Sequence, residues 1–273
     1  MKFAAVLLTD LVLAGAALAA PRGGLAERVK ARALRAHLSH PLLPAISIGG
    51  LDRENTSHVE YSGNWAGAVI ESPPAGQTFN GVSAVFTVPT PSAPSRSRSG
   101  FSAASAWVGI DGDTYQKAIL QTGIDFTVDE DGSVSYDAWY EWYPDYAYDF
   151  PGFFISAGDV ISLSVAASSS SKGTVVIENQ TTGQKVTKTL SAPSASSTLG
   201  GQNAEWIVED FEQNGQLVPF ADFGTVVFTD AVAQTASETV DLSGATILDI
   251  RQNGQVLTNV SIPSPSEVRI EYE

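Results

Sequence analysis

The chain has 273 residues, a length at which all-β proteins often form a single domain. Its 30 Asp and Glu residues outnumber its 15 Lys and Arg residues, and the resulting net charge of −15 argues against nucleic-acid partners because phosphates would be repelled. The chain contains no Cys, which excludes disulfides and cysteine-based zinc sites.

Residues 1–19 have the pattern of a secretory signal peptide. Lys2 supplies a positive start, residues 3–18 are largely apolar, and Ala17-Leu18-Ala19 is a small-x-small cleavage site. A membrane anchor is the alternative, but the apolar stretch is short and Asp10 interrupts it. We therefore expect a secreted, extracellular protein.

Residues 20–53 differ in charge from the rest of the chain. Residues 1–53 carry seven basic and three acidic side chains, whereas the remainder carries eight basic and 27 acidic ones. Residues 25–38 have the apolar spacing of a helix. A short basic helix ahead of an acidic domain predicts a propeptide that docks on that domain, inhibits it, and is released as carboxylates become protonated. A disordered linker is the alternative.

From about residue 61 onward the sequence predicts β-structure. Short runs of Val, Ile, Thr, Phe, Trp and Tyr alternate with turns rich in Gly, Pro, Ser and Asn. Asn253-Gly254 is typical of a hairpin turn, and no stretch has a convincing helical period. Such spacing predicts a sandwich or barrel for residues 54–273. The predicted strands are 64–70, 82–88, 118–126, 136–143, 160–166, 173–178, 205–211, 225–228 and 268–272.

The main β region lacks the residues of several catalytic classes. The three His residues are His37, His40 and His58, all of which precede that region. A Ser-His-Asp triad or a His-rich zinc site within it is therefore excluded. No Gly-rich phosphate loop follows a strand and opens a helix. An enzyme with this composition has to use carboxyl groups, and we expect neither a metal nor a cofactor.

Three predicted strands carry acids, amides or aromatic residues on one face, because side chains alternate between the two faces of a strand. A single acid in such a position is typical of a solvated sheet face. Three strands with the same mixture favour a substrate groove across a sheet. The residues are Ile119, Gln121, Gly123 and Asp125; Asp137, Trp139, Glu141 and Tyr143; and Glu205, Ile207 and Glu209.

The chain resembles the glutamic peptidase (eqolisin) family in five segments that follow the same order over roughly residues 60–272. They are YSGNWAGAV, FTVPTP, SAWVGIDGDTYQKAILQTGIDF, YDAWYEWYPDYAYDF and NAEWIVEDFEQNG. The resemblance implies an all-β fold, a sandwich of two antiparallel sheets of the concanavalin or jelly-roll type, with the substrate groove on a concave face. It also implies a secreted, acid-active endopeptidase that pepstatin does not inhibit.

The same resemblance implies the site residues. Gln121 of ILQTG and Glu205 of AEWIVED would form the catalytic dyad, and the YEWYPDY hairpin would be a mobile flap. Many members carry a Cys where Tyr115 stands, paired with one shortly before the NAEW strand. Both are absent here, which predicts reduced local rigidity with unchanged chemistry. The residues that would shape or support the groove are Trp107, Asp111, Asp125, Asp137, Trp139, Glu141 and Tyr143.

The two side chains of this dyad suggest a mechanism without a covalent intermediate. The Glu205 carboxylate can take a proton from water, which then attacks the peptide carbonyl, and can return the proton to the leaving amine. The Gln121 amide can orient the water and donate its N–H to the oxyanion. The alternatives are a glycoside hydrolase that uses Glu205 with Glu209 and a carbohydrate-binding module. Neither needs the ILQTG strand.

Charge also predicts how the domain responds to pH. Repulsion among groove carboxyl groups such as Asp125, Asp137 and Glu141 should raise their pKa values, so that the domain is stable in acid and weaker at neutral pH. We expect activity in acid on protein or peptide substrates, the propeptide as an inhibitor, a monomer, and neither nucleic-acid nor membrane partners.

Three glycosylation sequons suit a secreted protein. They begin at Asn55, Asn179 and Asn259.

Overall fold

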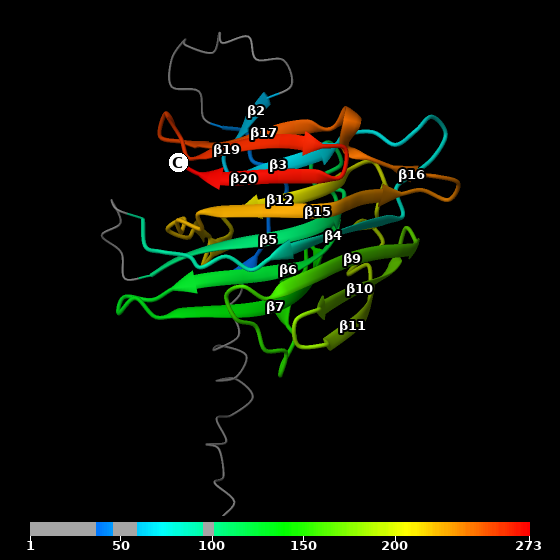
Figure 1. The fold of residues 1–273 in the computed structure, drawn as a ribbon. Coiled ribbons are helices and arrows are strands. Elements are labelled where there is room, and N and C mark those ends of the chain that lie inside the picture. The colour runs from blue at the N-terminus through cyan, green and yellow to red at the C-terminus, as the bar shows by residue number, and fades with distance from the viewer. Residues whose placement is uncertain (1–36, 46–58, 95–100) are drawn as a thin grey trace, which may run out of the picture. The chain divides into compact units, whose positions relative to one another are not determined.

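The computed structural model describes residues 37–45, 59–94 and 101–273 (Figure 1). The predicted signal peptide, most of the predicted propeptide and the sequon at Asn55 lie outside the described residues. Within the described residues, the one helix is the 3-10 helix η1 (Leu242–Gly244). The described part of the chain has no helix long and apolar enough to cross a membrane.

The larger sheet has nine strands in the order β18-β17-β3-β12-β5-β6-β7-β8, with β2 beside β17. Its neighbours are antiparallel except for β2 and β17, which run parallel. The sheet places β12, from late in the chain, between β3 and β5. Its strands are β2 (Val59–Ser62), β3 (Trp65–Ile70), β5 (Ser102–Ile110), β6 (Ile119–Val128), β7 (Val134–Tyr143), β8 (Tyr148–Asp149), β12 (Ala204–Glu209), β17 (Thr246–Gln252) and β18 (Gln255–Val256).

The second sheet has eight strands in the order β11-β10-β9-β4-β15-β20-β19, with β16 beside β15. Strand β11 forms one edge and exposes Lys185 and Lys188. The strands of this sheet are β4 (Gly81–Thr87), β9 (Val160–Ser169), β10 (Lys172–Asn179), β11 (Gln184–Ser191), β15 (Thr225–Gln234), β16 (Thr239–Val240), β19 (Thr258–Ser264) and β20 (Glu267–Tyr272). A small third sheet contains β1 (His37–Leu38), β13 (Glu212–Gln213) and β14 (Gln216–Leu217).

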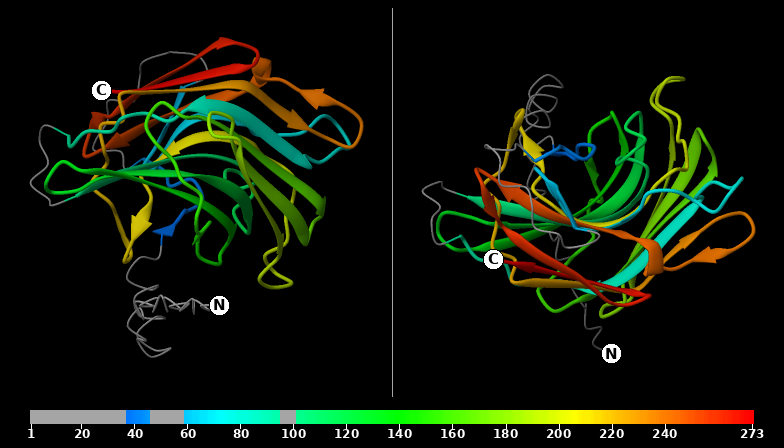
Figure 2. Two further views of the ribbon diagram at one scale, coloured as in Figure 1. Left: turned by 60° about the horizontal axis from the view of Figure 1, so that its bottom comes forward. Right: turned by 90° about the horizontal axis from the view of Figure 1, so that it is seen from above.

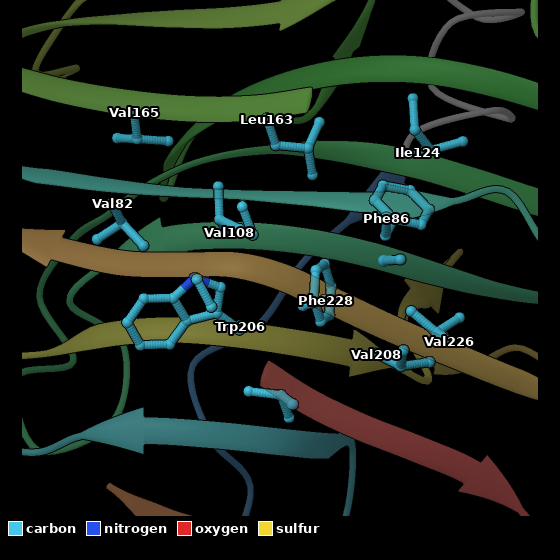
Figure 3. Packing of buried hydrophobic residues seen from close by; sticks show 14 of the residues in the cluster. Val82, Phe86, Val108, Ile124, Leu163, Val165, Trp206, Val208, Val226 and Phe228 are labelled. Atoms are coloured by element: carbon cyan, nitrogen blue, oxygen red, sulfur yellow. The ribbon is translucent and has the colours of Figure 1, made fainter. Parts of the chain in front are cut away.

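The two large sheets stack face to face around an apolar core (Figure 2). Figure 3 shows core residues from both sheets, with Val108 and Trp206 from the nine-stranded sheet and Phe86 and Phe228 from the other. The rings of Phe86 and Phe228 lie 5.5 Å apart. Burial of these side chains drives the packing of the two layers. The predicted sandwich of two antiparallel sheets is confirmed.

All nine strands predicted from the sequence overlap observed strands. The sequence pattern misses β5 because it is rich in Ala and Ser and is buried on both faces, and misses β11 because it is a polar edge strand. The predicted helix of residues 25–38 is wrong at its end. His37 and Leu38 form β1, since they pair with β13. The rest of that segment lies outside the described residues.

The predicted hairpin turn at Asn253-Gly254 joins β17 to β18. Asn253 has φ 51° and Gly254 has φ 78°. Positive φ at both central positions is the requirement of a type I′ turn, which Asn-Gly meets at low cost.

Candidate active site

The strands of the nine-stranded sheet bury a second apolar cluster on the side opposite to the core, which we call the site face. Alternation along β12 sends Trp206 and Val208 into the core and leaves Glu205, Ile207 and Glu209 on the site face. The buried apolar residues of the site face are Trp65, Val69, Trp107, Ile119, Trp139, Ile207 and Leu248.

Gln121 and Glu205 lie in one row across three adjacent strands, which we call the dyad row. Gly109 of β5 is the register partner of both Gln121 on β6 and Glu205 on β12. Neighbouring strands are about 4.8 Å apart, so the Cα atoms of Gln121 and Glu205 lie about 10 Å apart. Two long side chains on one face at this spacing can converge on a single small group, such as a water or a carbonyl.

Glycine at position 109 keeps the middle of the dyad row open. A Cβ atom there would lie 2.9 Å from Cζ3 of Trp107 and 3.3 Å from Cβ of Gln121. The first distance is shorter than real Cβ contacts allow, so the Trp107 ring would have to move. A side chain at this position would therefore disturb both the tryptophan and the candidate catalytic amide.

Glu205 and Gln121 are both fully buried, with 0 % exposure. Among the described residues, neither the two Glu205 oxygens nor Oε1 and Nε2 of Gln121 have a hydrogen-bond partner. Burial raises the pKa of Glu205 well above its usual value, and the carboxyl groups of Asp111 and Asp113 add to the effect. Buried polar groups normally pair within the protein, and perturbed pKa values cluster at functional sites.

Two further carboxyl groups are buried on the site face. Glu141 of β7 is the register partner of Gln121, and Glu209 of β12 accepts a 2.9 Å hydrogen bond from Nε1 of Trp107. Burial raises the pKa of Glu209 to about 7. Burial, followed by the repulsion of Glu209, raises the pKa of Glu141 well above its usual value. The sequence-based account was wrong about the leading cause, because loss of hydration outweighs like-charge repulsion.

The two predicted tryptophans are held in place on the site face. The Trp107 ring meets the Trp65 ring edge-on at 5.0 Å. Nε1 of Trp139 donates a 3.1 Å hydrogen bond to the Ser105 hydroxyl. Both indole N–H groups therefore have partners, as buried tryptophans usually require.

Asp111 supports the site from beside it. It follows β5 with φ 68°, in the left-handed region, and it is buried. Its carboxylate accepts hydrogen bonds from the backbone N–H groups of Gly200, Gly201 and Gln202, at 2.7, 2.9 and 2.7 Å. These residues immediately precede β12, which carries Glu205.

The remaining predicted groove residues lie away from the dyad row. Asp125 and Asp137 are register partners on β6 and β7, four residues along from the dyad row or about 13 Å. Asp137 is exposed and Asp125 is half-buried. Tyr143, at the end of β7, packs against the apolar cluster of the site face and lies in the middle of the YEWYPDY segment.

Residues 37–45, which we call the strap, cross the site face (Figure 2, blue). The backbone N–H of Leu42 donates to the carbonyl of Gly112 at 3.0 Å. The carbonyl of Leu42 accepts from Nε2 of Gln116 at 3.1 Å. The Leu42 side chain packs on the apolar cluster.

Polar contacts tie the strap to the buried carboxyl groups. The Ser39 hydroxyl donates to Oε2 of Glu209, and the Ser39 N–H donates to Oε2 of Glu141 at 3.3 Å. The His40 N–H donates to Oε1 of Glu209 at 3.1 Å, and the imidazole Nε2 lies 3.0 Å from Oε2 of Glu212. The strap thus supplies hydrogen-bond donors to Glu141 and Glu209, two carboxyl groups whose pKa values are raised by burial.

His37 fills an aromatic position at one end of the site face. Its ring stacks on Phe211 at 4.0 Å and meets the Trp139 ring edge-on at 4.9 Å. Nδ1 lies 2.7 Å from Oδ2 of Asp125. Burial opposes the charged imidazole, but the Asp125 carboxylate outweighs it and raises the pKa of His37. The backbone N–H of Ala147, the residue directly after the predicted flap, donates to the His37 carbonyl at 3.2 Å.

The two described sequons differ in accessibility. The Asn179 side chain is buried, and its amide nitrogen donates to Oδ2 of Asp159 at 2.8 Å and to the carbonyl of Phe154 at 3.3 Å. Asn259 is exposed on β19. The folded domain therefore disfavours a glycan at Asn179 and leaves Asn259 open to one.

Sequence reasoning gave no role to Gly109 or Asn64, and it assigned the strap only as part of the predicted propeptide. The place of Gly109 follows from strand register, which a single sequence does not reveal. Asn64 accepts a 2.9 Å hydrogen bond from the N–H of Leu43, and its own amide lies 3.5 Å from Oε1 of Glu209. A polar residue directly before the buried run of β3 was the available signal.

Metal binding has no obvious place in the described residues, which contain no group of three or more His, Asp or Glu side chains arranged to hold an ion.

Comparison with known proteins gives consistent matches. The model of the peptidase A4 family matches residues 63–272. The chain is 48% identical to Aspergillopepsin-2 of Aspergillus niger, over 100% of both chains, and 42% identical to Scytalidopepsin B of Scytalidium lignicola, over 96% of both.

Two solved structures are also similar. One is scytalido-glutamic peptidase with a transition state analog inhibitor, at TM-score 0.68 and 43% identity, covering 77% of this chain and 98% of that chain. The other is aspergilloglutamic peptidase from Aspergillus niger, at TM-score 0.60 and 56% identity, covering 63% of this chain and 99% of that chain. The family match includes the dyad row and every strand of the two large sheets except β2.

Proposed function

We propose that this chain, which belongs to the peptidase A4 family, is a secreted, acid-active endopeptidase with Glu205 and Gln121 as its catalytic pair. Membership in the family makes it a glutamic peptidase. The observation that carries the dyad is the row in which Gly109 separates the two side chains, whose buried polar atoms have no partner among the described residues.

In this mechanism Glu205, as a carboxylate, takes a proton from a water held between it and Gln121. The water oxygen attacks the peptide carbonyl, and the amide N–H of Gln121 donates to the oxyanion that forms. Glu205 then returns the proton to the nitrogen of the scissile bond, which breaks to release an amine and a carboxylic acid. Only Glu205 has to change protonation state, because an amide does not titrate in the working range.

The buried surroundings of the dyad tune this chemistry. A raised pKa makes the Glu205 carboxylate a stronger base, while it lowers the ionised fraction in acid. Trp107 and Trp139 exclude water along the dyad row and offer flat apolar surfaces to a peptide. Glu141 lies beside Gln121 and is placed to orient its amide when protonated.

A glycoside hydrolase is the less favoured function. Its two carboxyl groups should stand about 5 to 9.5 Å apart. Glu205 and Glu209 are four residues apart on one extended strand, or about 13 Å. Glu209 is also occupied by the Nε1 donor of Trp107, which lies in the catalytic domain. These positions favour peptide hydrolysis by Glu205 with Gln121.

The segment before the domain completes the proposal. Residues 1–19 would direct secretion and be removed, and residues 20–53 would act as an inhibitory propeptide. Support comes from the strap, which belongs to that segment and bonds to Glu141, the neighbour of Gln121. Leaving the strap in place would keep a peptide substrate off the site face. The mature enzyme would act as a monomer on proteins and peptides.

Digestion of a denatured protein at pH 3 tests the function. We expect cleavage that pepstatin and a chelator leave unchanged, since neither an aspartic pair nor a metal takes part. Strong inhibition by either reagent would rule out the proposal. Glu205→Gln should abolish cleavage, whereas Glu209→Gln, on the same strand face, should retain more activity. Equal activity in a folded Glu205→Gln variant would remove Glu205 from the mechanism.

A further inference from the structure

We propose that Tyr115 is a positioning residue that fixes Glu205 through the segment of residues 198–203. This inference rests on the proposed role of Glu205. Tyr115 lies in the connection between β5 and β6, and the segment it contacts leads directly into β12.

Tyr115 holds this segment by three separate contacts. Its hydroxyl donates to the carbonyl of Thr198 at 2.8 Å, and its backbone N–H donates to Oδ1 of Asn203 at 3.1 Å. Its ring lies against Gly200, where an added Cβ atom would stand 2.7 Å from the ring carbon Cδ2. The contacts reach both ends of the segment and its middle.

The segment is connected to Glu205 by the sheet itself. Asn203 stands two residues before Glu205, and its carbonyl accepts a 3.1 Å hydrogen bond from the N–H of Asp111. Ala204 then begins the pairing of β12 with Ile110 of β5. A shift of residues 198–203 would therefore enter β12 at the end nearest to Glu205.

This segment has little of its own to keep it in place. Its sequence, TLGGQN, contains two adjacent glycines and three polar residues, with Leu199 as its single large apolar anchor. Glycine has the greatest backbone freedom to lose on folding. The absence of the two cysteines predicted a less rigid segment. The contacts indicate otherwise, because the ring and hydroxyl of Tyr115, together with Asp111, hold the same backbone without a covalent bond.

Other contacts hold the segment from the core side. Nε1 of Trp142 donates to the carbonyl of Ser197 at 2.8 Å, and the N–H of Leu199 donates to the carbonyl of Ser170 at 2.8 Å. These bonds do not involve Tyr115. Loss of the Tyr115 side chain should therefore leave the fold intact while releasing the side of the segment that faces Glu205.

The contact geometry also permits a covalent substitute. A Cβ atom on residue 200 would lie 2.9 Å from Cγ of Tyr115. The two Cβ atoms would then be at most about 4.4 Å apart, within the range that a disulfide spans. Gly200 is not among the glycines with positive φ, so a cysteine fits its backbone.

The test compares turnover by the acid-activated full chain and its variants, well below their melting temperatures. Tyr115→Ala should lower kcat about tenfold with little change in KM, because a small displacement of a catalytic group is costly. Tyr115→Phe loses only the hydrogen bond of the hydroxyl, so its kcat should lie between those of the parent and Tyr115→Ala. The oxidised double variant Tyr115→Cys/Gly200→Cys should recover kcat to within about twofold of the parent, and a reductant should remove that recovery.

Two results would overturn the inference. One is an unchanged kcat in folded Tyr115→Ala; the other is an oxidised double variant that regains its melting temperature but not its kcat. Tyr61→Ala, which removes an aromatic ring stacked on Arg251 of β17, is the matched control and should leave kcat unchanged. Glu205→Gln in the same assay separates this question from the proposed mechanism, since its inactivity stands whatever Tyr115 does.

Discussion

The two faces of the nine-stranded sheet are equally buried and chemically opposite. The core face of β6 and β12 carries Leu120, Ile124, Trp206 and Val208. The site face of the same strands buries carboxyl and amide groups among tryptophans. Burial of apolar groups stabilises the fold at any pH, whereas burial of carboxyl groups stabilises it only while they are protonated. The proposed catalytic groups thus lie on the face where burial of polar side chains costs free energy.

Neighbouring residues of β6 give the sharpest test of this difference. Gln121→Ala should lower kcat on the order of 100-fold, with a nearly unchanged melting temperature, because it removes the oxyanion donor. Leu120→Ala should cost about 3 kcal/mol of stability, with kcat kept in the folded fraction. Thermal melts and steady-state kinetics of both variants decide. Loss of activity and stability together in Gln121→Ala would mean that the two faces are not separable.

Stability should fall as pH rises from about 4 to 7. Folded-state pKa values of Glu209, about 7, and of Asp249, about 6, lie above their usual values, mainly because of burial. The native state therefore binds more protons, and this stability is fully present below the unfolded pKa and lost as pH climbs through the folded one. For Glu209 alone the shift corresponds to about 3 kcal/mol.

Melting temperatures at pH 3 and pH 8 measure this effect. Asp131 and Asp241 have lowered pKa values through bonds to Ser133 and Ser243, but both are exposed, so they oppose the trend only weakly. Asp249→Asn should flatten the decline between pH 4 and 6 without changing kcat. A higher melting temperature at pH 8 would contradict the account.

The strap donates hydrogen bonds to the buried carboxyl groups of Glu141 and Glu209, so its release should also depend on pH. His37 and His40 add contacts to the carboxyl groups of Asp125 and Glu212. The full-length variant His37→Asn/His40→Asn lacks these pairs at every pH. It should mature about tenfold faster at pH 5 to 6, as measured by the appearance of the new N-terminus. His58→Asn is the control, and identical pH profiles for all three chains would refute the histidine contacts.

Two hydroxyl groups on opposite faces should give the smallest effects. Ser105→Ala leaves Nε1 of Trp139 without its partner on the site face, and should change kcat/KM by about threefold. Thr122→Val removes the 2.6 Å bond to the Trp139 carbonyl, and should cost about 1 kcal/mol of stability with unchanged kinetics. Steady-state kinetics and thermal melts of the two variants show whether single hydrogen bonds also affect activity on the site face and stability on the core face.

Local pattern was enough to predict a sandwich or barrel, nine strands and the two faces of β6 and β12, and the family resemblance favoured the sandwich. Period-two alternation is written in the sequence, so the core face could be read directly. Motif resemblance supplied Gln121 and Glu205 as a pair. Their adjacency across Gly109 depends on pairing between strands about 100 residues apart, which no local pattern encodes.

The path of the strap across the site face could not be predicted from local pattern. The helical spacing of residues 25–38 ends in His37 and Leu38, but their pairing with β13 outweighs that propensity. The sequence also did not reveal that burial is the main cause of the raised pKa values. Counting charged residues indicates repulsion between them but not how far each one is removed from water. Sequence thus named the groups that we propose as catalytic, and the tertiary fold revealed what surrounds them.

Strand β11 bears on the solubility of the protein where it works. A free sheet edge is a template for strand addition between copies, and lysines are a common defence. The chain has an isoelectric point of about 4.5, so in acid its carboxylates lose their charge and general repulsion weakens. Strand β11 exposes two lysines, Lys185 and Lys188, and lysine side chains in general are cationic in acid. The edge of β11 therefore keeps its positive charge, and with it protection against aggregation, at an acidic pH where the rest of the surface loses its charge repulsion.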